Sequence, residues 1–368
     1  METATLLLER YKIIESLGEG GFSKVVKAFD TKMERVVAIK TIPAGRQRAV
    51  RALREAKTVA LLNHPNIVTL FEFEQKDDSY YLIMEFIEGQ NLAALLDRYQ
   101  KLPNDLALAA TIQICEALSF AHKNDVIHRD IKPANLRVLD DGRIKVMDFG
   151  IARLRSAAKT SGLTAEGEVV GTFAYMSPEQ ASGEMVDERS DIFSLGILLY
   201  EMVTGRLPFF ADTPAGTIYK ILNDAPVPAE ELERSVPSAL GQVINQAISK
   251  DPQDRFQNTS EMKTRLERLL QTDGHMPDIV TDLVEHLEEP IEISDDGLLS
   301  SLRRTSNSWV RKHQDTAIAT TFAVGSALVA SWANVYMTSP LIPLQAFLPV
   351  AIFFLALFLP PAGLAALF

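Results

Sequence analysis

The sequence predicts an α+β fold with two lobes, followed by helices that cross a membrane. Three features of its 368 residues lead to this prediction. Residues 11–87 are rich in short β-prone runs, and residues 88–270 carry the apolar spacing of helices. Residues 316–368 contain no Asp, Glu, Lys or Arg. A small β-rich N-lobe beside a larger helical C-lobe would form a cleft, where ligand sites concentrate.

The N-lobe is expected to be an antiparallel sheet with one helix. Runs of β-branched and aromatic residues predict strands over residues 25–29, 36–42, 67–73 and 80–86. Residues 46–62 have helical spacing, and His64-Pro65-Asn66 should end that helix.

The C-lobe is expected to be mostly helical. Apolar residues recur at helical intervals and predict helices over residues 91–99, 106–123, 187–204, 215–223, 238–249 and 260–270. A strand is expected over residues 143–147. Residues 271–315 form a linker that is first acidic and then basic, and Pro277 and Pro290 interrupt it.

The composition argues against several classes of protein. The formal net charge is −11, so no electrostatic footprint for nucleic acid is expected. The single cysteine, Cys115, cannot form an internal disulfide, and its apolar helical context predicts a core residue. The first 12 residues have too short an apolar run, and an acidic flank, for a secretory signal. The two lobes should therefore stay in the cytoplasm.

A glycine-rich motif lies between two predicted strands. It reads Gly18-Glu19-Gly20-Gly21-Phe22-Ser23-Lys24-Val25. Glycines allow the tip of a hairpin to approach phosphate groups closely and to offer them backbone N–H groups. An ordinary strand turn can be equally rich in glycine, so the motif alone leaves both interpretations open.

Lys40 ends the apolar run Val37-Ala38-Ile39 and continues its strand. A buried ammonium group is costly unless an anion pairs with it, so Lys40 should have an acidic partner. Glu55, on the helix predicted next, is the natural candidate. A lysine whose stem lies along the surface is the alternative, and it would suit an edge strand better.

Residues 126–142, VIHRDIKPANLRVLDDG, bring three polar groups together. Asp130, Lys132 and Asn135 fall within six residues, and an acid, a cation and an amide this close usually serve a polar ligand or a reaction. Shortly afterwards Asp148 stands beside Phe149 and Gly150. Its carboxylate suits a hard cation such as Mg²⁺, although an isolated tripeptide of this kind is more often an ordinary turn.

In this order and spacing the motifs resemble a eukaryotic-like serine/threonine protein kinase, of the kind that bacteria also encode. The resemblance covers about residues 11–270, and its segments are GEGGFSKV, VAIK, Glu55, MEFIEG, HRDIKPAN, DFG, GTFAYMSPE, DIFSLG and DPQDRF. It implies the bilobal protein-kinase fold, with an N-lobe over residues 11–87 and a C-lobe over residues 88–270. It also implies ATP and Mg²⁺ as cofactors and proteins with Ser/Thr hydroxyl groups as substrates.

The resemblance implies a role for each catalytic residue. Asp130 would accept or orient the proton of the substrate hydroxyl, and Lys132 would neutralise the transferring γ-phosphoryl group. Asn135 and Asp148 would hold Mg²⁺. The expected ATP-binding residues are Leu17, Gly18, Glu19, Gly20, Gly21, Phe22, Ser23, Lys24, Val25, Ala38, Lys40, Glu55, Glu85 and Ile87, with Met84 at the back of the adenine pocket.

A regulated activation segment over residues 148–179 is also implied. Arg129 resembles the arginine that pairs with a phosphate on this segment. The candidate regulatory residues of the segment are Thr160, Ser161, Thr164 and Thr172, and Thr172 resembles the serine/threonine class.

Two structural pairings follow from the same resemblance. Glu179 and Arg255 should form a buried ion pair that braces the C-lobe, and Asp191 should cap the backbone of the catalytic loop.

Arg137 departs from the family pattern. Its position matches a residue whose side chain usually forms the apolar floor under adenine. We expect the arginine to lay its methylene stem there and to send its guanidinium group to water. Weakened ATP binding is the alternative.

The uncharged tail predicts a two-span hairpin within residues 316–368. Residues 316–337 are long enough to cross a hydrocarbon core, residues 341–359 are a second candidate, and four basic residues (Arg303, Arg304, Arg311 and Lys312) favour the cytoplasm for the preceding side. The expected location is thus the inner or plasma membrane, with lipid as a partner. A stripe of small residues (Ala319, Ala323, Ala327 and Ser331) permits contact with the second span or with another copy, as in a homodimer. Buried helices packed on the kinase are the alternative.

Two other functions compete with a tethered kinase. An ATP-binding pseudokinase could serve as a membrane scaffold, and Arg137 is the one residue in its favour. A transporter subunit is disfavoured because the two spans contain no ionisable residue for an ion or proton path.

Overall fold

The computed structural model describes residues 6–20, 23–43, 62–77, 79–149 and 173–272. These residues all belong to the first of two units of the chain, Met1–Glu289. The predicted N-lobe helix, apart from its last residue, and the predicted linker and spans lie outside the described residues.

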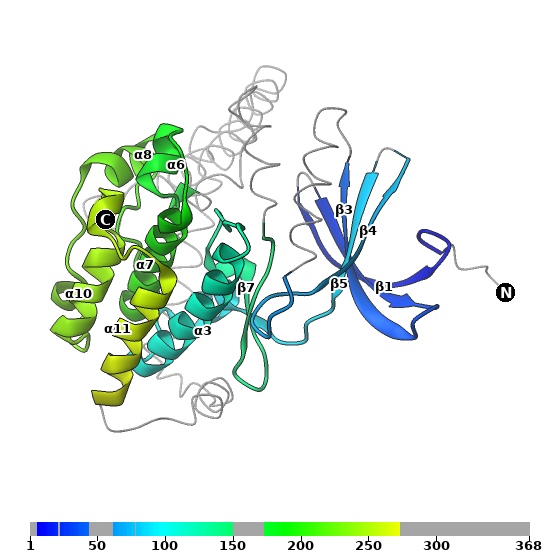
Figure 1. Cartoon of the computed structure of the whole chain (residues 1–368), viewed down its shortest axis with the longest axis horizontal. Helices are drawn as coiled ribbons and strands as arrows, with labels where there is room; N and C mark the ends of the chain where they lie inside the picture. The colour runs from blue at the N-terminus through cyan, green and yellow to red at the C-terminus, as the bar shows by residue number, and fades with distance from the viewer. Residues whose placement is uncertain (1–5, 21–22, 44–61, 78, 150–172, 273–368) are drawn as a thin grey trace, which may run out of the picture. The chain divides into compact units, whose positions relative to one another are not determined.

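Five antiparallel strands form the N-lobe sheet (Figure 1). They are β1 (Tyr11–Gly20), β2 (Ser23–Asp30), β3 (Arg35–Pro43), β4 (Leu70–Lys76) and β5 (Ser79–Glu85), in the order β1-β2-β3-β5-β4. Every second residue of β2 is buried from Val26 to Asp30, as in a half-covered sheet, whereas β3 is buried at four consecutive residues, Val37 to Lys40. The buried cluster consists of Tyr11, Val26, Ala28, Val37, Ile39 and Ile83.

The strand predicted over residues 67–73 begins later, at Leu70. Ile67 instead forms a parallel bridge with Val146 of the C-lobe, and the Val68 N–H donates to the Val146 carbonyl at 3.0 Å. Residues 67 and 68 therefore tie the chain to the second lobe before it enters the sheet of the first. This is why the apolar run extends beyond the N-lobe strand itself.

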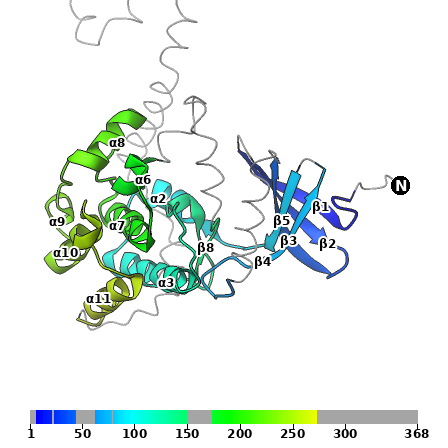
Figure 2. The ribbon, with the colours of Figure 1, turned by 45° about the horizontal axis from the view of Figure 1, so that its top comes forward.

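The C-lobe is built around two long helices, α3 (Asn104–His122) and α7 (Glu188–Thr204). Both are apolar on most sides, and α3 packs against α7 and α11 (Figures 1 and 2). Cys115 is fully buried in α3, and burial raises the pKa of its thiol. The remaining helices are α2 (Leu92–Tyr99), α6 (Pro178–Ser182), α8 (Pro214–Asn223), α9 (Ala229–Leu232), α10 (Ser238–Ala247) and α11 (Thr259–Thr272). The predicted helices are confirmed, with ends that move by one or two residues.

A small three-stranded sheet lies at the start of the C-lobe. It consists of β6 (Gln90–Asn91), β7 (Leu136–Val138) and β8 (Ile144–Val146), in the order β6-β7-β8. The strand predicted over residues 143–147 is β8. A short 3₁₀ helix, η1 (Pro133–Asn135), leads directly into β7, and β8 leads to Asp148. The small sheet therefore positions the two polar segments identified in the sequence, the one that contains Asp130 to Asn135 and the one that begins at Asp148.

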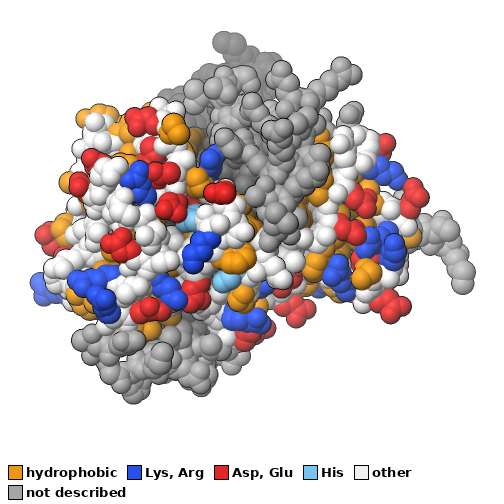
Figure 3. All heavy atoms as spheres, viewed as in Figure 1, with side chains coloured by type: hydrophobic (Ala, Val, Ile, Leu, Met, Phe, Trp, Pro, Cys, Tyr) orange, Lys and Arg blue, Asp and Glu red, His pale blue; other side chains and the backbone are white. Residues whose placement is uncertain are grey.

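The described surface has mixed charge. Acidic and basic side chains are interspersed over the face shown in Figure 3. Within the described ranges, none of the helices combines the length and the apolar character that crossing a bilayer requires.

A buried ion pair braces the C-lobe, as predicted. Arg255 donates Nη1 and Nη2 to the two carboxylate oxygens of Glu179 at 2.8 and 2.9 Å, and Ser190 donates its hydroxyl to the same carboxylate. Burial would raise the pKa of Glu179, but these hydrogen bonds hold it below its ordinary value. Arg255 also donates to the backbone carbonyls of Ser249, Arg189 and Lys250. The pair thus joins α6 to the segments around α7 and η2 (Pro252–Asp254).

We expect the Glu179→Gln substitution to lower the free energy of unfolding by about 3–5 kcal/mol, because it leaves the Arg255 cation buried without its anion. Urea unfolding followed by far-ultraviolet circular dichroism measures this loss. The matched control is Lys263→Met, which removes a part-exposed pair with Glu116 and should cost less than about 1 kcal/mol. Equal losses in the two variants would contradict a bracing role for the Glu179–Arg255 pair.

Candidate active site

The buried carboxylate of Asp191 organises the catalytic loop. Asp191, in the first turn of α7, accepts the backbone N–H groups of His128 at 2.8 Å and Arg129 at 2.7 Å. His122, at the end of α3, donates Nε2 to the same carboxylate at 2.8 Å. Complete burial would raise the pKa of Asp191, but these donors keep it below its ordinary value. The predicted cap is confirmed, and His122 is an addition to it.

Two residues of the site have left-handed backbone conformations. Arg129 has φ 67° and Asp148 has φ 61°. Such angles are unfavourable for residues other than glycine, so surrounding contacts must hold them. For Arg129, Asp191 accepts the N–H group and the Gln180 side chain donates to the carbonyl at 2.8 Å. Gln180 belongs to α6, so the conformation of the loop depends on helix α6 as well as on α7.

His128 connects the catalytic loop to the segment before Asp148. Its Nδ1 accepts the Asp130 N–H at 3.2 Å, and its Nε2 therefore donates to the Met147 carbonyl at 2.8 Å. The ring packs edge-on against Phe149, with centroids 4.6 Å apart. The histidine is fully buried and sets the distance between the two polar loops.

Asp130, Lys132 and Asn135 converge, as predicted from their spacing. Lys132 Nζ lies 3.0 and 2.9 Å from the two carboxylate oxygens of Asp130. Asn135 Nδ2 donates to Asp130 Oδ2 at 3.0 Å and to the Asp130 carbonyl at 2.7 Å. The amide nitrogen is thus engaged with Asp130, which leaves the amide oxygen of Asn135 turned away from that carboxylate. The arrangement places a carboxylate, an ammonium group and an amide oxygen within one small volume.

Lys40 bridges the two lobes. It is buried in β3, and its Nζ lies 2.7 Å from Oδ1 of Asp148. The sequence predicts an acidic partner for this lysine, and among the described residues that partner is Asp148. Glu55, the partner that was predicted, lies outside the described residues. The ion pair brings the central strand of the N-lobe sheet to the C-lobe loop.

Asn135 and Asp148 fit the requirements of Mg²⁺. Both offer oxygen atoms, and Mg²⁺ prefers one or two protein oxygen ligands together with water and phosphate oxygens. Elsewhere in the described ranges no cluster of three or more His, Cys, Asp or Glu side chains is arranged to hold a metal ion. A cation held by these two residues would take its remaining ligands from water and phosphate oxygens.

The N-lobe strands place the expected nucleotide residues next to one another. In the sheet register Val25 pairs with Lys40, and Ala38 pairs with Met84, one residue before Glu85. The glycine-rich motif is the hairpin between β1 and β2, where Gly18 pairs with Val25, Glu19 with Lys24 and Gly20 with Ser23. Leu17 is partly exposed and Ile87 is buried. Gly21, Phe22, Thr160, Ser161, Thr164 and Thr172 lie outside the described residues.

One nitrogen of the Arg137 guanidinium group binds the backbone of the chain between the lobes. Nη1 donates to the carbonyls of Gly89 at 2.8 Å and Ile87 at 3.3 Å, and the side chain is half-buried. The expectation of a solvated guanidinium did not include these bonds, which form because the chain between the lobes presents backbone acceptors within reach of Nη1. Sequence spacing gives no sign of these acceptors, which lie about fifty residues earlier.

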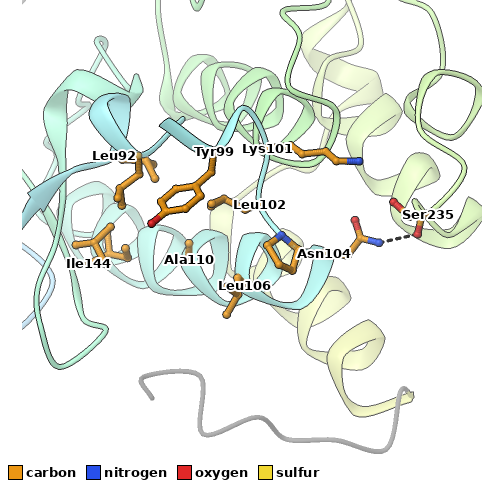
Figure 4. A pocket seen from close by; sticks show the side chains of 12 residues that line it. Leu92, Tyr99, Lys101, Leu102, Asn104, Leu106, Ala110, Ile144 and Ser235 are labelled. Atoms are coloured by element: carbon orange, nitrogen blue, oxygen red, sulfur yellow. Dashed lines mark hydrogen bonds between the residues drawn. The ribbon is translucent and has the colours of Figure 1, made fainter. Parts of the chain in front are cut away.

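A separate pocket of about 490 Å³ lies between α2, α3 and the small sheet (Figure 4). Its lining is mainly aliphatic, including Leu92, Leu106 and Ile144. Polar groups gather at one end, where Asn104 donates Nδ2 to the Ser235 carbonyl at 2.6 Å. Its lining contains none of the polar residues described above, so the site chemistry lies elsewhere.

Comparison with known proteins agrees with this geometry. Residues 11–266 match the protein kinase domain model. The chain belongs to the protein kinase family. It is 42% identical over 266 residues to a probable serine/threonine-protein kinase of Clostridium acetobutylicum, which is 71% of this chain and 40% of that protein.

Two further relatives of this chain are serine/threonine-protein kinases named PknB. The protein of Mycobacterium leprae is 38% identical over 277 residues, 73% of this chain and 44% of the relative. The protein of Mycolicibacterium smegmatis is 38% identical over 293 residues, 77% of this chain and 46% of the relative. The chain thus spans less than half the length of these curated relatives.

Asp130→Asn and Lys40→Met should each reduce phosphoryl transfer by at least about 100-fold, because in the roles that the family resemblance implies Asp130 accepts the proton of the substrate hydroxyl and Lys40 holds phosphate groups. Transfer of labelled phosphate from γ-labelled Mg²⁺-ATP by the full chain measures the loss. Asp125→Asn, an exposed carboxylate five residues before Asp130, is the control and should keep its activity. Near-normal transfer by purified Asp130→Asn would refute the assigned roles.

Proposed function

We propose that this chain is a membrane-tethered serine/threonine protein kinase that transfers the γ-phosphoryl group of ATP to Ser/Thr hydroxyl groups of proteins. One observation carries the proposal. Asp130, Lys132 and Asn135 meet on the C-lobe, while Lys40 reaches Asp148 from the N-lobe. The names of the relatives support the same activity for this chain. In the transfer assay, labelled phosphate should appear on serine and threonine.

The residues of the site suit an in-line phosphoryl transfer. The substrate hydroxyl would give its proton to Asp130 as its oxygen bonds to the γ-phosphorus and the bond from that phosphorus to the bridging oxygen of ADP breaks. Lys132, already against Asp130, would offset the charge of the transferring group. Mg²⁺ held by Asn135 and Asp148 would supply charge neutralisation at the phosphate oxygens. Fixed charges provide most of the catalysis because the reaction needs little covalent chemistry from the protein.

Regulation through the activation segment is the second part of the proposal. The Arg129 backbone is held at both its N–H and its carbonyl, so its side chain starts from a fixed point. An arginine whose backbone is fixed is a suitable partner for a phosphate, because the pairing then mainly orders the phosphorylated segment.

We expect the full chain to phosphorylate its own activation segment, at Thr164 first and at Thr160 or Ser161 otherwise. Phosphopeptide mapping after incubation with Mg²⁺-ATP detects the modification. The Asp130→Asn chain is the control and should remain unmodified when it is incubated alone. Full activity without phosphate between residues 153 and 170 would refute this regulation.

Membrane tethering is the third part of the proposal, and it rests on the uncharged residues 316–368 and the basic cluster before them. We expect the full chain to stay with the membrane fraction during a carbonate wash, whereas residues 1–300 should be released. If both chains wash off equally, the tail does not span the bilayer. Retention of both would place the membrane contact within the first 300 residues.

A further inference from the structure

Two cationic side chains on the small sheet contact the segment that joins the lobes. This segment, residues 85–89, is called the hinge segment below. Arg137 on β7 pairs directly with Lys145 on β8 in the sheet register. Directly opposed residues of an antiparallel pair project on the same side of a sheet, and like charges there repel each other. The arrangement therefore needs compensating acceptors.

Lys145 finds its acceptors at the beginning of the hinge segment. Its Nζ lies 2.8 Å from Oε2 of Glu85 and 3.2 Å from the Ile67 carbonyl. The Glu85 carboxylate also accepts the Thr69 N–H at 3.2 Å, and the Glu85 N–H donates to the Thr69 carbonyl at 2.9 Å. Glu85 is therefore fixed through both its side chain and its backbone, and the Lys145 charge is neutralised.

Arg137 binds the other end of the hinge segment, where its guanidinium group donates to two carbonyl groups. It donates to Gly89 and Ile87, and within the described part of the chain no carboxylate lies within ion-pairing distance of it. A hydrogen bond from a charged donor is stronger than one between neutral groups. Because this cation has no ion pair among the described residues, its main structural effect is to hold the two carbonyl groups to which it donates.

Gly89 shows how closely the hinge segment approaches β7. Its φ is +138°, and a Cβ atom built there would lie 2.3 Å from the Val138 carbonyl oxygen. Only glycine combines that backbone angle with that contact. The hinge segment therefore lies directly against β7 at residue 89, and Arg137, one residue before Val138, binds the Gly89 carbonyl at the same place.

We infer that Arg137 is a positioning residue for the nucleotide base: it fixes Ile87 and Gly89 on β7, so that the hinge segment presents its backbone groups to the base in one arrangement. This inference rests on the proposed kinase function. Within the described residues, the hydrogen bonds of Arg137 go to Ile87 and Gly89 and not to the polar loops, so its effect should fall on nucleotide binding and leave the transfer step unchanged. A preformed hinge lowers the ordering cost of binding.

The first test separates KM from kcat in the full chain. Arg137→Met should raise the KM for ATP about tenfold, the size of effect expected from losing a charged hydrogen bond, with kcat changed less than about twofold. Arg137→Lys keeps a charged donor on a shorter reach and should give an intermediate KM. Arg143→Met, an exposed arginine in the turn between β7 and β8, is the control and should match the original chain.

The second test asks which part of the nucleotide responds. Adenosine and inorganic tripolyphosphate are used as competitors of ATP, one for the base and sugar and the other for the phosphates. In Arg137→Met the inhibition constant of adenosine should rise in parallel with the KM for ATP, while that of tripolyphosphate stays unchanged.

Three outcomes would overturn the inference. An unchanged or lower KM in Arg137→Met would mean that an apolar floor serves the base better than a fixed hinge. Equal weakening of adenosine and tripolyphosphate would indicate a general loss of structure. A higher KM in Arg137→Lys than in Arg137→Met would exclude a role for the charged donor. If the unaltered chain transfers no phosphate, the proposed function fails, and calorimetric binding of adenosine to the same variants still decides the role of Arg137.

Discussion

The carboxylate of Asp191 holds the catalytic loop in a shape that the loop would not adopt by itself. Arg129 needs a left-handed backbone angle, which costs about 1 kcal/mol or more, and a buried carboxylate is itself unfavourable unless donors surround it. The hydrogen bonds between the loop and the carboxylate offset both costs, because the N–H groups of the loop are the donors that the carboxylate requires. Since α7 is buried on nearly all sides, its position is fixed by the core, and the loop inherits that position.

From this point the site extends outward through a short series of contacts. His128 links the loop to Met147, Asp148 follows, and Lys40 reaches it from the N-lobe. Each step joins segments distant in sequence, so the geometry of the polar groups depends on the packing of both lobes. The hinge segment supplies a second connection through Lys145 and Arg137, which involves neither Asp130 nor Asp148.

Much of this arrangement is readable from the sequence, and the exceptions have physical causes. Long helices and the β2–β3 pair are predictable because their apolar residues repeat over many positions. Strands β6 and β7 are two and three residues long, too short for any periodicity to appear. The apolar run at residues 67–73 gave no sign that its first residues would pair with the other lobe.

The site residues also fall into those that the sequence identifies and those that it does not. Asp130, Lys132, Asn135 and Asp148 were identifiable because adjacent residues specify their roles. Lys145 carried a usable signal, a lysine within an apolar strand, which is the argument applied to Lys40. His122 had no such signal, since a histidine at a helix end is ordinary. The direction of the Arg137 side chain depends on carbonyl groups that become its neighbours only after folding.

The Lys40–Asp148 pair would couple the binding of nucleotide and metal ion in the proposed reaction. A dication at Asp148 competes with the Lys40 ammonium for the carboxylate, and a polyphosphate at Lys40 competes with the carboxylate for the ammonium. When both ligands arrive together, each member of the ion pair exchanges one charged partner for another. The pair thus favours linkage: each of the two ligands should bind more tightly in the presence of the other, by the same factor in both directions.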